Sequence, residues 1–128
     1  TLPALEVRRP DWPDTAHLIG PLLWEPTDEI FARPEGSGPL IMIAPSTAVT
    51  GADDMLGIAL RALTPTTLAR DVRIIVSGIG IHAHVVDALC AETGRDRRSV
   101  VVGLGRQDEL LATDDVAAVI CGGGHGLL

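Results

Sequence analysis

Short apolar runs alternate with stretches of mixed polarity from residue 40 onward. The runs are rich in branched side chains and too short for buried helices, which is typical of buried strands. They lie at residues 40–44, 72–77, 99–102 and 116–121. Between them, apolar residues recur every three or four positions, as in helices packed on one side. This alternation predicts an α/β fold, a Rossmann-like parallel sheet with helices on both faces.

Three helices are expected, over residues 51–63, 82–93 and 107–113. The first is expected to bury a face made of Met55, Ile58, Ala59, Ala62 and Leu63. The second is expected to bury the side formed by Val85, Val86, Leu89 and Cys90. Gly94 is expected to end that second helix in the left-handed conformation.

The first 39 residues differ in composition from the rest of the chain and hold seven of the nine prolines. Proline at this density blocks helix interiors and central strands. The segment is therefore an ordered linker or a wrapping segment. We place the domain boundary after residue 38, with residues 39–128 as the α/β part.

Composition limits the kinds of molecule that the chain is expected to bind. The net charge of −7 argues against nucleic acid, whose phosphates select basic surfaces. No apolar run approaches the roughly 20 residues of a membrane helix, and no secretory signal is visible, so we expect a cytoplasmic protein with no membrane span. The absence of lysine excludes a Walker-type phosphate lysine.

Cysteine and histidine suggest neither a disulfide framework nor a metal site. Cys90 and Cys121 are expected to be reduced and buried. His82 and His84 could hold a metal on a strand, but they lie at the expected start of a helix. We therefore predict no metal and no cofactor.

Every expected strand ends in a small or flexible residue. The residues that follow the four strands are Pro45-Ser46, Gly78, Gly103 and Gly122. Ligands of open α/β sheets bind at the carboxyl ends of the strands. The four loops therefore predict one ligand site.

The last of these loops carries the clearest chemistry. Gly122, Gly123, Gly124 and Gly126 surround His125, and their amides could bind a phosphate without interference from side chains. His125 could donate to the same anion, and Ser46 and Thr47 could offer hydroxyls to it. The plainer alternatives are a permissive turn for the glycines and a helix cap for Ser46 or Thr47.

Three stretches resemble the GT-B glycosyltransferases of family 1, the antibiotic, macrolide and flavonoid type. They are Gly20–Trp24 (GPLLW), Leu104–Leu111 (LGRQDELL) and Ile120–Gly126 (ICGGGHG). The resemblance implies that residues 1–38 are the end of an acceptor domain and the interdomain linker. It also implies that residues 39–128 are the first half of the C-terminal donor domain, truncated inside an element.

The resemblance also assigns roles to single positions. Ser46 or Thr47 matches the hydroxyl residue that contacts the donor phosphates, and the glycine–histidine loop resembles the pyrophosphate clamp. The stretch from Val102 through Gly103 to Gln107 resembles the loop that borders the nucleobase, with Leu104 at the position of a stacking tryptophan in the plant branch. In the clamp this chain has Gly122 where the family has histidine, and Leu127 where it has threonine or serine.

The function implied is transfer of a sugar from a UDP- or dTDP-sugar to a hydroxyl of a small-molecule acceptor such as a natural product. No metal is needed in this design. The family's catalytic base has no match among these histidines, so the 128 residues alone are expected to be inactive. A small α/β nucleotide-binding module without transfer activity and a nucleotide-sugar epimerase of GT-B architecture stay open as alternatives, as does a homodimer.

Overall fold

The computed structural model describes residues 9–17, 27–45, 52–113 and 115–122. Contacts within the chain divide it into two units, Thr1–Trp24 with Gly123–Leu128 and Glu25–Gly122. Of the first unit the described part is residues 9–17, where Arg9 forms an ion pair with Asp11 at 2.6 Å. The second unit carries the sheet and its helices.

Four parallel strands form the sheet in the order β3-β2-β1-β4. They are β1 (Leu40–Ala44), β2 (Arg73–Ser77), β3 (Val100–Gly103) and β4 (Val116–Cys121). β1 pairs with β2 on one side and with β4 on the other. All five residues of β1 are buried, because this strand is central and is covered on both faces. The strands lie within one residue of their predicted bounds, and the parallel sheet confirms the predicted fold class.

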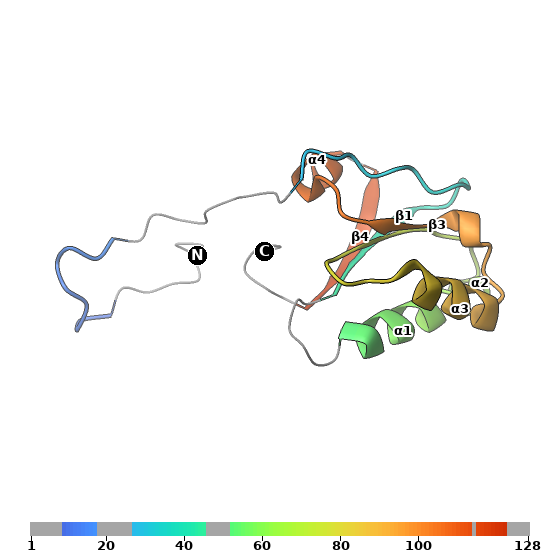
Figure 1. Ribbon diagram of the computed structural model, residues 1–128, viewed down its shortest axis with the longest axis horizontal. Coiled ribbons are helices and arrows are strands. Elements are labelled where there is room, and N and C mark those ends of the chain that lie inside the picture. The colour runs from blue at the N-terminus through green and yellow to red at the C-terminus, as the bar shows by residue number, and fades with distance from the viewer. Residues whose placement is uncertain (1–8, 18–26, 46–51, 114, 123–128) are drawn as a thin grey trace. The chain divides into compact units, whose positions relative to one another are not determined.

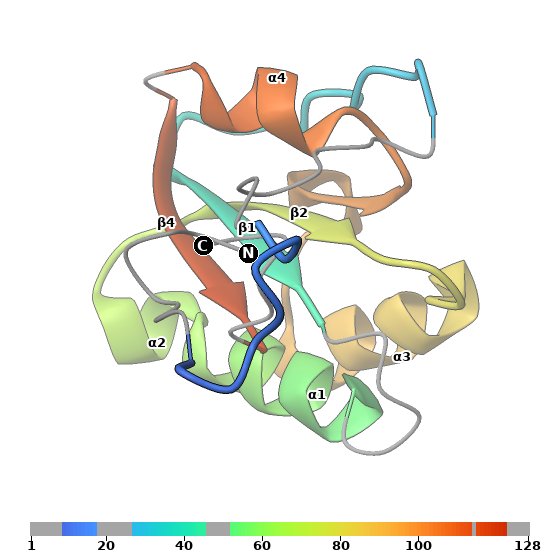
Figure 2. The ribbon, with the colours of Figure 1, turned by 90° about the vertical axis from the view of Figure 1, so that its left-hand side faces the viewer.

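Helices cover both faces of the sheet. They are α1 (Ala52–Ala62), α2 (Pro65–Leu68), α3 (Ala83–Thr93), the short 3-10 helix η1 (Arg97–Ser99) and α4 (Gln107–Leu111). α1 and α3 lie on one face, whereas α4 and the extended segment 27–39 lie on the other (Figures 1 and 2). The prediction of helices on both faces is confirmed.

The main core fills the space between the sheet and the pair α1 and α3. Alternate residues of β1 and β2 point into it, since successive side chains of a strand face opposite sides. The strands contribute Ile41, Ile43, Ile74 and Val76, and the helices contribute Leu56, Ala59, Leu60, Val86, Leu89 and Cys90. Val85 packs at the margin of this core, so the predicted buried side of α3 is confirmed.

The predicted buried face of α1 is wrong in two positions. Ile58 is 66% exposed and Ala62 is exposed, whereas Leu56 and Leu60 are fully buried. Apolar residues lie on more than one side of this helix, so a spacing of three and four residues fits two different faces. The face that packs in the core is the one formed by Leu56, Ala59 and Leu60.

Two short helices were not predicted. Pro65 is the first residue of α2, whose N-cap Thr64 accepts a hydrogen bond from the Thr67 amide at 3.3 Å. η1 is capped by Asp96, whose carboxylate accepts from the Arg98 amide at 3.0 Å. Gly94 ends α3 at φ +67°, as predicted.

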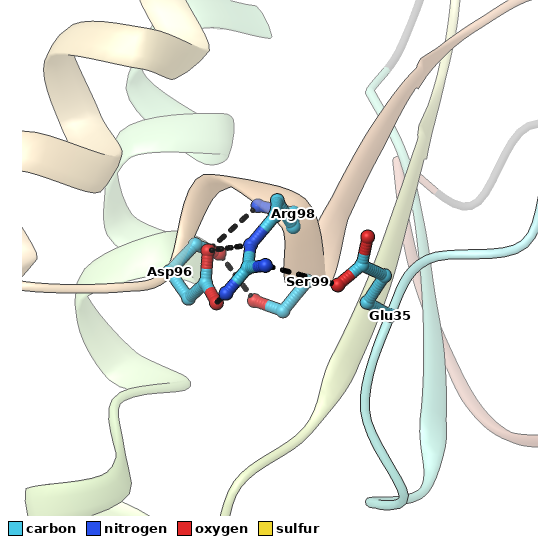
Figure 3. A network of polar contacts seen from close by, with 4 residues as sticks. All are labelled: Glu35, Asp96, Arg98 and Ser99. Carbon is cyan, nitrogen blue, oxygen red and sulfur yellow. Dashed lines mark hydrogen bonds and ion pairs between the residues drawn. The ribbon is translucent and has the colours of Figure 1, made fainter.

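Segment 27–39 crosses the second face and is held near both of its ends. Near one end the Arg106 amide donates to the Glu29 carbonyl at 2.7 Å, and toward the other the Glu35 amide donates to the Arg98 carbonyl at 2.9 Å. The Arg98 guanidinium lies between Glu35, at 3.5 Å, and Asp96, at 2.9 Å (Figure 3). Nearby, Arg73 Nε donates to the Gly38 carbonyl at 2.7 Å. The segment is therefore a wrapping segment over residues 27–39.

Arg95 is a buried cation that joins the ends of three elements. It is 7% exposed and donates to the carbonyls of Val72, at 3.1 Å, and Leu63. Burial lowers the pKa of this guanidinium below its ordinary value, and its Nε has no hydrogen-bond partner among the described residues. Its role is to satisfy two main-chain carbonyls at the amino-terminal side of the sheet.

β4 is the least covered strand. Its residues are partly or fully exposed, in contrast to β1, because β4 lies at an edge of the sheet. Asp115, just before it, pairs with Arg33 at 2.9 Å and with Arg73 at 3.6 Å. The edge position also corrects the expectation for Cys121, which is partly exposed, while Cys90 is buried as predicted.

Candidate functional site

The carboxyl ends of all four strands meet at one edge of the sheet. In the register of the sheet, Ser77 of β2 pairs with Gly103 of β3, and Ala44 of β1 pairs with Cys121 of β4. A Cβ placed on Gly78 would lie 3.8 Å from Pro45 Cδ, so the loops after β1 and β2 are neighbours. The loops that sequence reasoning selected therefore begin side by side.

The strand order reverses between β1 and β4 at this edge. The chain proceeds outward from β1 through β2 to β3 and then returns to the opposite side of β1 as β4. Open α/β sheets bind ligands where the strand order reverses in this way, since the connections diverge to opposite faces there. Pro45 and Gly122 are the described residues that begin the two flanking loops.

A buried polar pair lies at the same edge. Gln107 at the start of α4 donates from Nε2 to the Ser77 hydroxyl at 2.8 Å. Ser77 is 1% exposed and Gln107 is partly exposed. Ser77 points to the α4 face because its strand neighbour Val76 points into the opposite core.

The loop between β3 and α4 is held on the wrapping segment. The Phe31 ring packs so closely on Gly105 that a Cβ there would lie 2.8 Å from a ring carbon. The next amide, that of Arg106, donates to the Glu29 carbonyl at 2.7 Å. Leu104 is thus presented from a fixed backbone with 41% of its surface exposed.

Electrostatics near the loop are dominated by an ion pair. Arg106 donates to both Asp108 oxygens, at 2.9 and 2.6 Å, and lies 3.5 Å from Glu109. The hydrogen bonds from Arg106 lower the pKa of Asp108 to about 2, and the same bonds raise the pKa of the guanidinium. Because its charge is matched, Arg106 is a poor partner for an added anion.

Other arginines follow the same pattern. In the ranges 9–17, 27–45, 52–113 and 115–122, carboxylates or main-chain carbonyls bind Arg9, Arg33, Arg61, Arg73, Arg95, Arg97, Arg98 and Arg106. The chain has no lysine. An anion at the carboxyl edge would therefore depend on main-chain amides and neutral donors more than on side-chain cations.

His82 and His84 stack on each other at the start of α3, with ring centroids 5.4 Å apart and an interplanar angle of 17°. Both are exposed. The described part of the chain contains no group of three or more His, Cys, Asp or Glu side chains arranged for a metal ion.

The sequence-predicted site residues fall into two groups. Gly78, Gly103, Leu104, Gln107 and Gly122 lie at the carboxyl edge. Val102 lies there too, and its partly buried side chain packs against the α1–α3 core. Ser46, Thr47, Gly123, Gly124, His125 and Gly126 lie outside the described residues.

Sequence reasoning missed two residues of this site, Ser77 and Phe31. Ser77 could have been found as the polar residue that follows the apolar run Ile74–Val76 in a buried strand. For Phe31 the signal was weaker, since a single aromatic side chain in a proline-rich segment has no periodicity. Its partner Gly105, one residue after Leu104, was the better clue.

Within the described ranges, no helix is both long and apolar enough to cross a membrane. The chain matches no protein-family model, and no curated protein or solved structure is significantly similar to it.

Proposed function

We propose that the carboxyl edge binds the nucleotide of a UDP- or dTDP-sugar, and that the chain is the donor-binding part of a glycosyltransferase. The observation that carries this proposal is the Ser77–Gln107 pair at the carboxyl edge of a sheet whose strand order reverses between β1 and β4. It supplies a partly exposed amide at the edge where sheets of this kind bind nucleotides.

The spacing of the strands fits a nucleotide laid across the edge. Adjacent strands are about 4.8 Å apart, so β3 and β1 are separated by roughly 10 Å. This is comparable to the distance between the base and the diphosphate of an extended nucleotide. The base would lie at Leu104 and Gln107, and the diphosphate would extend toward Pro45 and Gly122.

The charge distribution favours amide donors for the diphosphate. The arginines named above already have partners, and glycine amides bind phosphate without needing a cation. In this proposal the amides of Gly122–Gly126 and the His125 imidazole hold the leaving diphosphate, with Ser46 or Thr47 as a hydroxyl donor.

The reaction proposed is a displacement at the anomeric carbon. The acceptor oxygen forms the new bond to that carbon, the bond to the diphosphate oxygen breaks, and its electron pair leaves with the nucleotide. The acceptor proton passes to a base that we do not assign to any histidine of this chain. Donors aimed at the diphosphate oxygens stabilise the charge that develops there.

Calorimetric titration tests the proposal. UDP and dTDP are compared with UMP and dTMP, using the protein and its His125→Ala variant. We expect a preference for the diphosphates of roughly ten-fold or more, since hydrogen bonds to charged groups contribute about 1.5–3 kcal/mol, and we expect that preference to fall in the variant. No binding of any of the four nucleotides would refute the proposal.

The same titration separates the transferase from a plain nucleotide-binding module. A transferase site must accept the diphosphate with a hexose attached, so a UDP- or dTDP-hexose should compete with the free nucleotide at similar concentration. A module whose pocket closes around the terminal phosphate would exclude the hexose. Exclusion of every nucleotide sugar tested, with the free diphosphate still bound, would favour the module.

A further inference from the structure

The wrapping segment, residues 27–39, lies on the face of the sheet opposite to α1 and α3 (Figures 1 and 2). Met42 of β1 and Ile75 of β2 point to this face, because their strand neighbours point into the α1–α3 core, and both are fully buried. The other cover on this face is α4, a helix of five residues. Burial of this side of the sheet therefore depends in part on a segment without helix or strand.

Contacts with other elements hold the wrapping segment in place. Phe31 and Pro34 are its buried residues, and the residues beside them are exposed or half-buried. Because the segment has no ladder of hydrogen bonds of its own, its order depends on these anchors and on its contacts at either end. Parts of a protein that are held in this way open as contiguous units, with a free energy below that of global unfolding.

At the carboxyl edge of the sheet, the wrapping segment holds the site loop, residues 103–106. The Glu29 carbonyl accepts from the Arg106 amide at 2.7 Å. The Phe31 ring leaves no room for a Cβ on Gly105. The conformation of the site loop thus depends on the segment.

At the amino edge, the same segment is held by a clasp formed by Glu35, Asp96 and Arg98 (Figure 3). The Arg98 guanidinium lies 3.5 Å from the Glu35 carboxylate and 2.9 Å from that of Asp96. The Glu35 amide donates to the Arg98 carbonyl at 2.9 Å. The clasp is exposed, so it can open without disturbing the core of the domain.

Only six residues of chain separate the two attachments. From Glu29 to Glu35 the backbone can span at most about 20 Å, and it includes the fixed φ of Pro34 and the packed ring of Phe31. So short and constrained a stretch has little slack with which to release one end and keep the other.

We propose that the wrapping segment acts as a strap with two states, attached and detached, which the clasp and the site loop share. In the attached state, Glu29 and Phe31 hold the loop that presents Leu104. In the detached state, the loop loses both contacts together. Detachment also uncovers apolar residues of the sheet, so the detached state is the minor one.

The strap gives the site a means of regulation from the opposite edge of the sheet, and this part of the inference rests on the proposed function. A nucleotide that requires the ordered site loop binds the attached state. Binding and attachment then strengthen each other by the same factor, as linkage requires. Any contact that opens the clasp weakens the site without touching it.

Hydrogen exchange of two amides tests the strap without any ligand. The Glu35 amide reports on the clasp, and the Arg106 amide reports on the site loop, because each donates to the other side of an attachment. In the unaltered protein, nuclear magnetic resonance should show both amides exchanging faster than those of β1, with similar protection factors. An Arg106 amide as slow as β1 would show that no separate strap opening exists.

Glu35→Gln removes the charge of the clasp from the segment and leaves Arg98 paired with Asp96. An exposed ion pair changes an equilibrium by up to about five-fold, so both protection factors should fall together by roughly two- to five-fold. The matched control is Glu92→Gln, which breaks the exposed pair with Arg61 on the other face and should change neither amide. A fall at Glu35 alone, or at neither amide, would refute the coupling.

The reverse perturbation starts at the site loop. Gly105→Ala crowds the Phe31 ring and should lower the protection factor of the distant Glu35 amide by the same factor as that of Arg106. This variant keeps every residue of the clasp. An unchanged Glu35 amide beside a faster Arg106 amide would mean that the segment frays from one end, which contradicts a two-state strap.

UDP then tests the link to the proposed site. At about ten times its dissociation constant, UDP should slow exchange of both amides by roughly ten-fold, if it binds the attached state alone. Binding of UDP that slows Arg106 and leaves Glu35 unchanged would refute regulation through the strap and leave the nucleotide site standing. No binding of UDP would refute the proposed function, whereas the two variants would still decide whether the strap exists.

Discussion

Replacing Gly105 by alanine should damage the site loop by overpacking. The added Cβ would lie 2.8, 2.9 and 3.0 Å from three carbons of the Phe31 ring. A ring that is 7% exposed cannot turn aside as the end of a flexible side chain can. Overpacking of a filled core costs about 1–3 kcal/mol. Alanine also restricts the unfolded chain, which returns about 0.4–1 kcal/mol.

The net expectation is a loss of about 1–2 kcal/mol of unfolding free energy. In a domain of this size, each kcal/mol lowers Tm by roughly 4–8 °C. Urea unfolding followed by circular dichroism measures the first quantity, and a thermal scan measures the second. Phe31→Leu should recover part of the loss in the double variant, because a smaller side chain makes room for the Cβ.

Gly103→Ala is the matched control, two residues away at the end of β3. Its Cβ would meet nothing within 4 Å, so no overpacking is expected and stability should change by less than about 0.5 kcal/mol. If Gly105→Ala is as stable as Gly103→Ala, the close packing of Phe31 on this loop does not exist in solution, and the account of a fixed Leu104 fails with it.

Three further outcomes are expected. Because the pKa of Asp108 is lowered to about 2 from an unfolded value near 3.9, its contribution to stability is present above about pH 4 and is lost as pH falls through 2. A carbon-13 carboxyl titration should show that pKa return toward 3.9 in Arg106→Gln, and an unmoved pKa would contradict the pairing. Arg95→Met should lower the unfolding free energy by about 2–4 kcal/mol, since it leaves two buried carbonyls unpaired, and a urea midpoint equal to that of the unaltered protein would contradict this. A thiol reagent should modify Cys121 and spare Cys90 in the folded protein, since burial both shields the Cys90 thiol and raises its pKa, and two equal rates would be inconsistent with the fold.

Strand positions were predictable because each strand is a continuous run of branched apolar residues. Parallel strands covered on both faces are mostly apolar, so β1 and the run Ile74–Val76 of β2 were clear in the sequence. The buried face of α1 was not predictable, because apolar residues lie on more than one side of that helix. Which side is buried depends on the elements that pack against it. A local pattern cannot contain that information.

The sequence predicted which loops form the candidate site, but it did not predict the contacts that their residues make. Glycine and proline after each strand marked the carboxyl edge, and the strand order then brought those loops together. The Ser77–Gln107 hydrogen bond joins residues 30 positions apart and depends on how α4 lies on the sheet. No spacing in the sequence encodes such a pairing. The same holds for the Phe31 ring on Gly105.

The contrast between buried β1 and exposed β4 has a consequence for amide hydrogen exchange. β1 is paired on both sides and fully covered, so its amides should exchange only through global unfolding. β4 pairs with β1 alone among the described strands and has little cover, so its amides should exchange through smaller, local openings. The strand-order reversal thus lies between a slowly exchanging strand and a faster one. A ligand bound there should slow amide exchange along β4 before it changes exchange along β1.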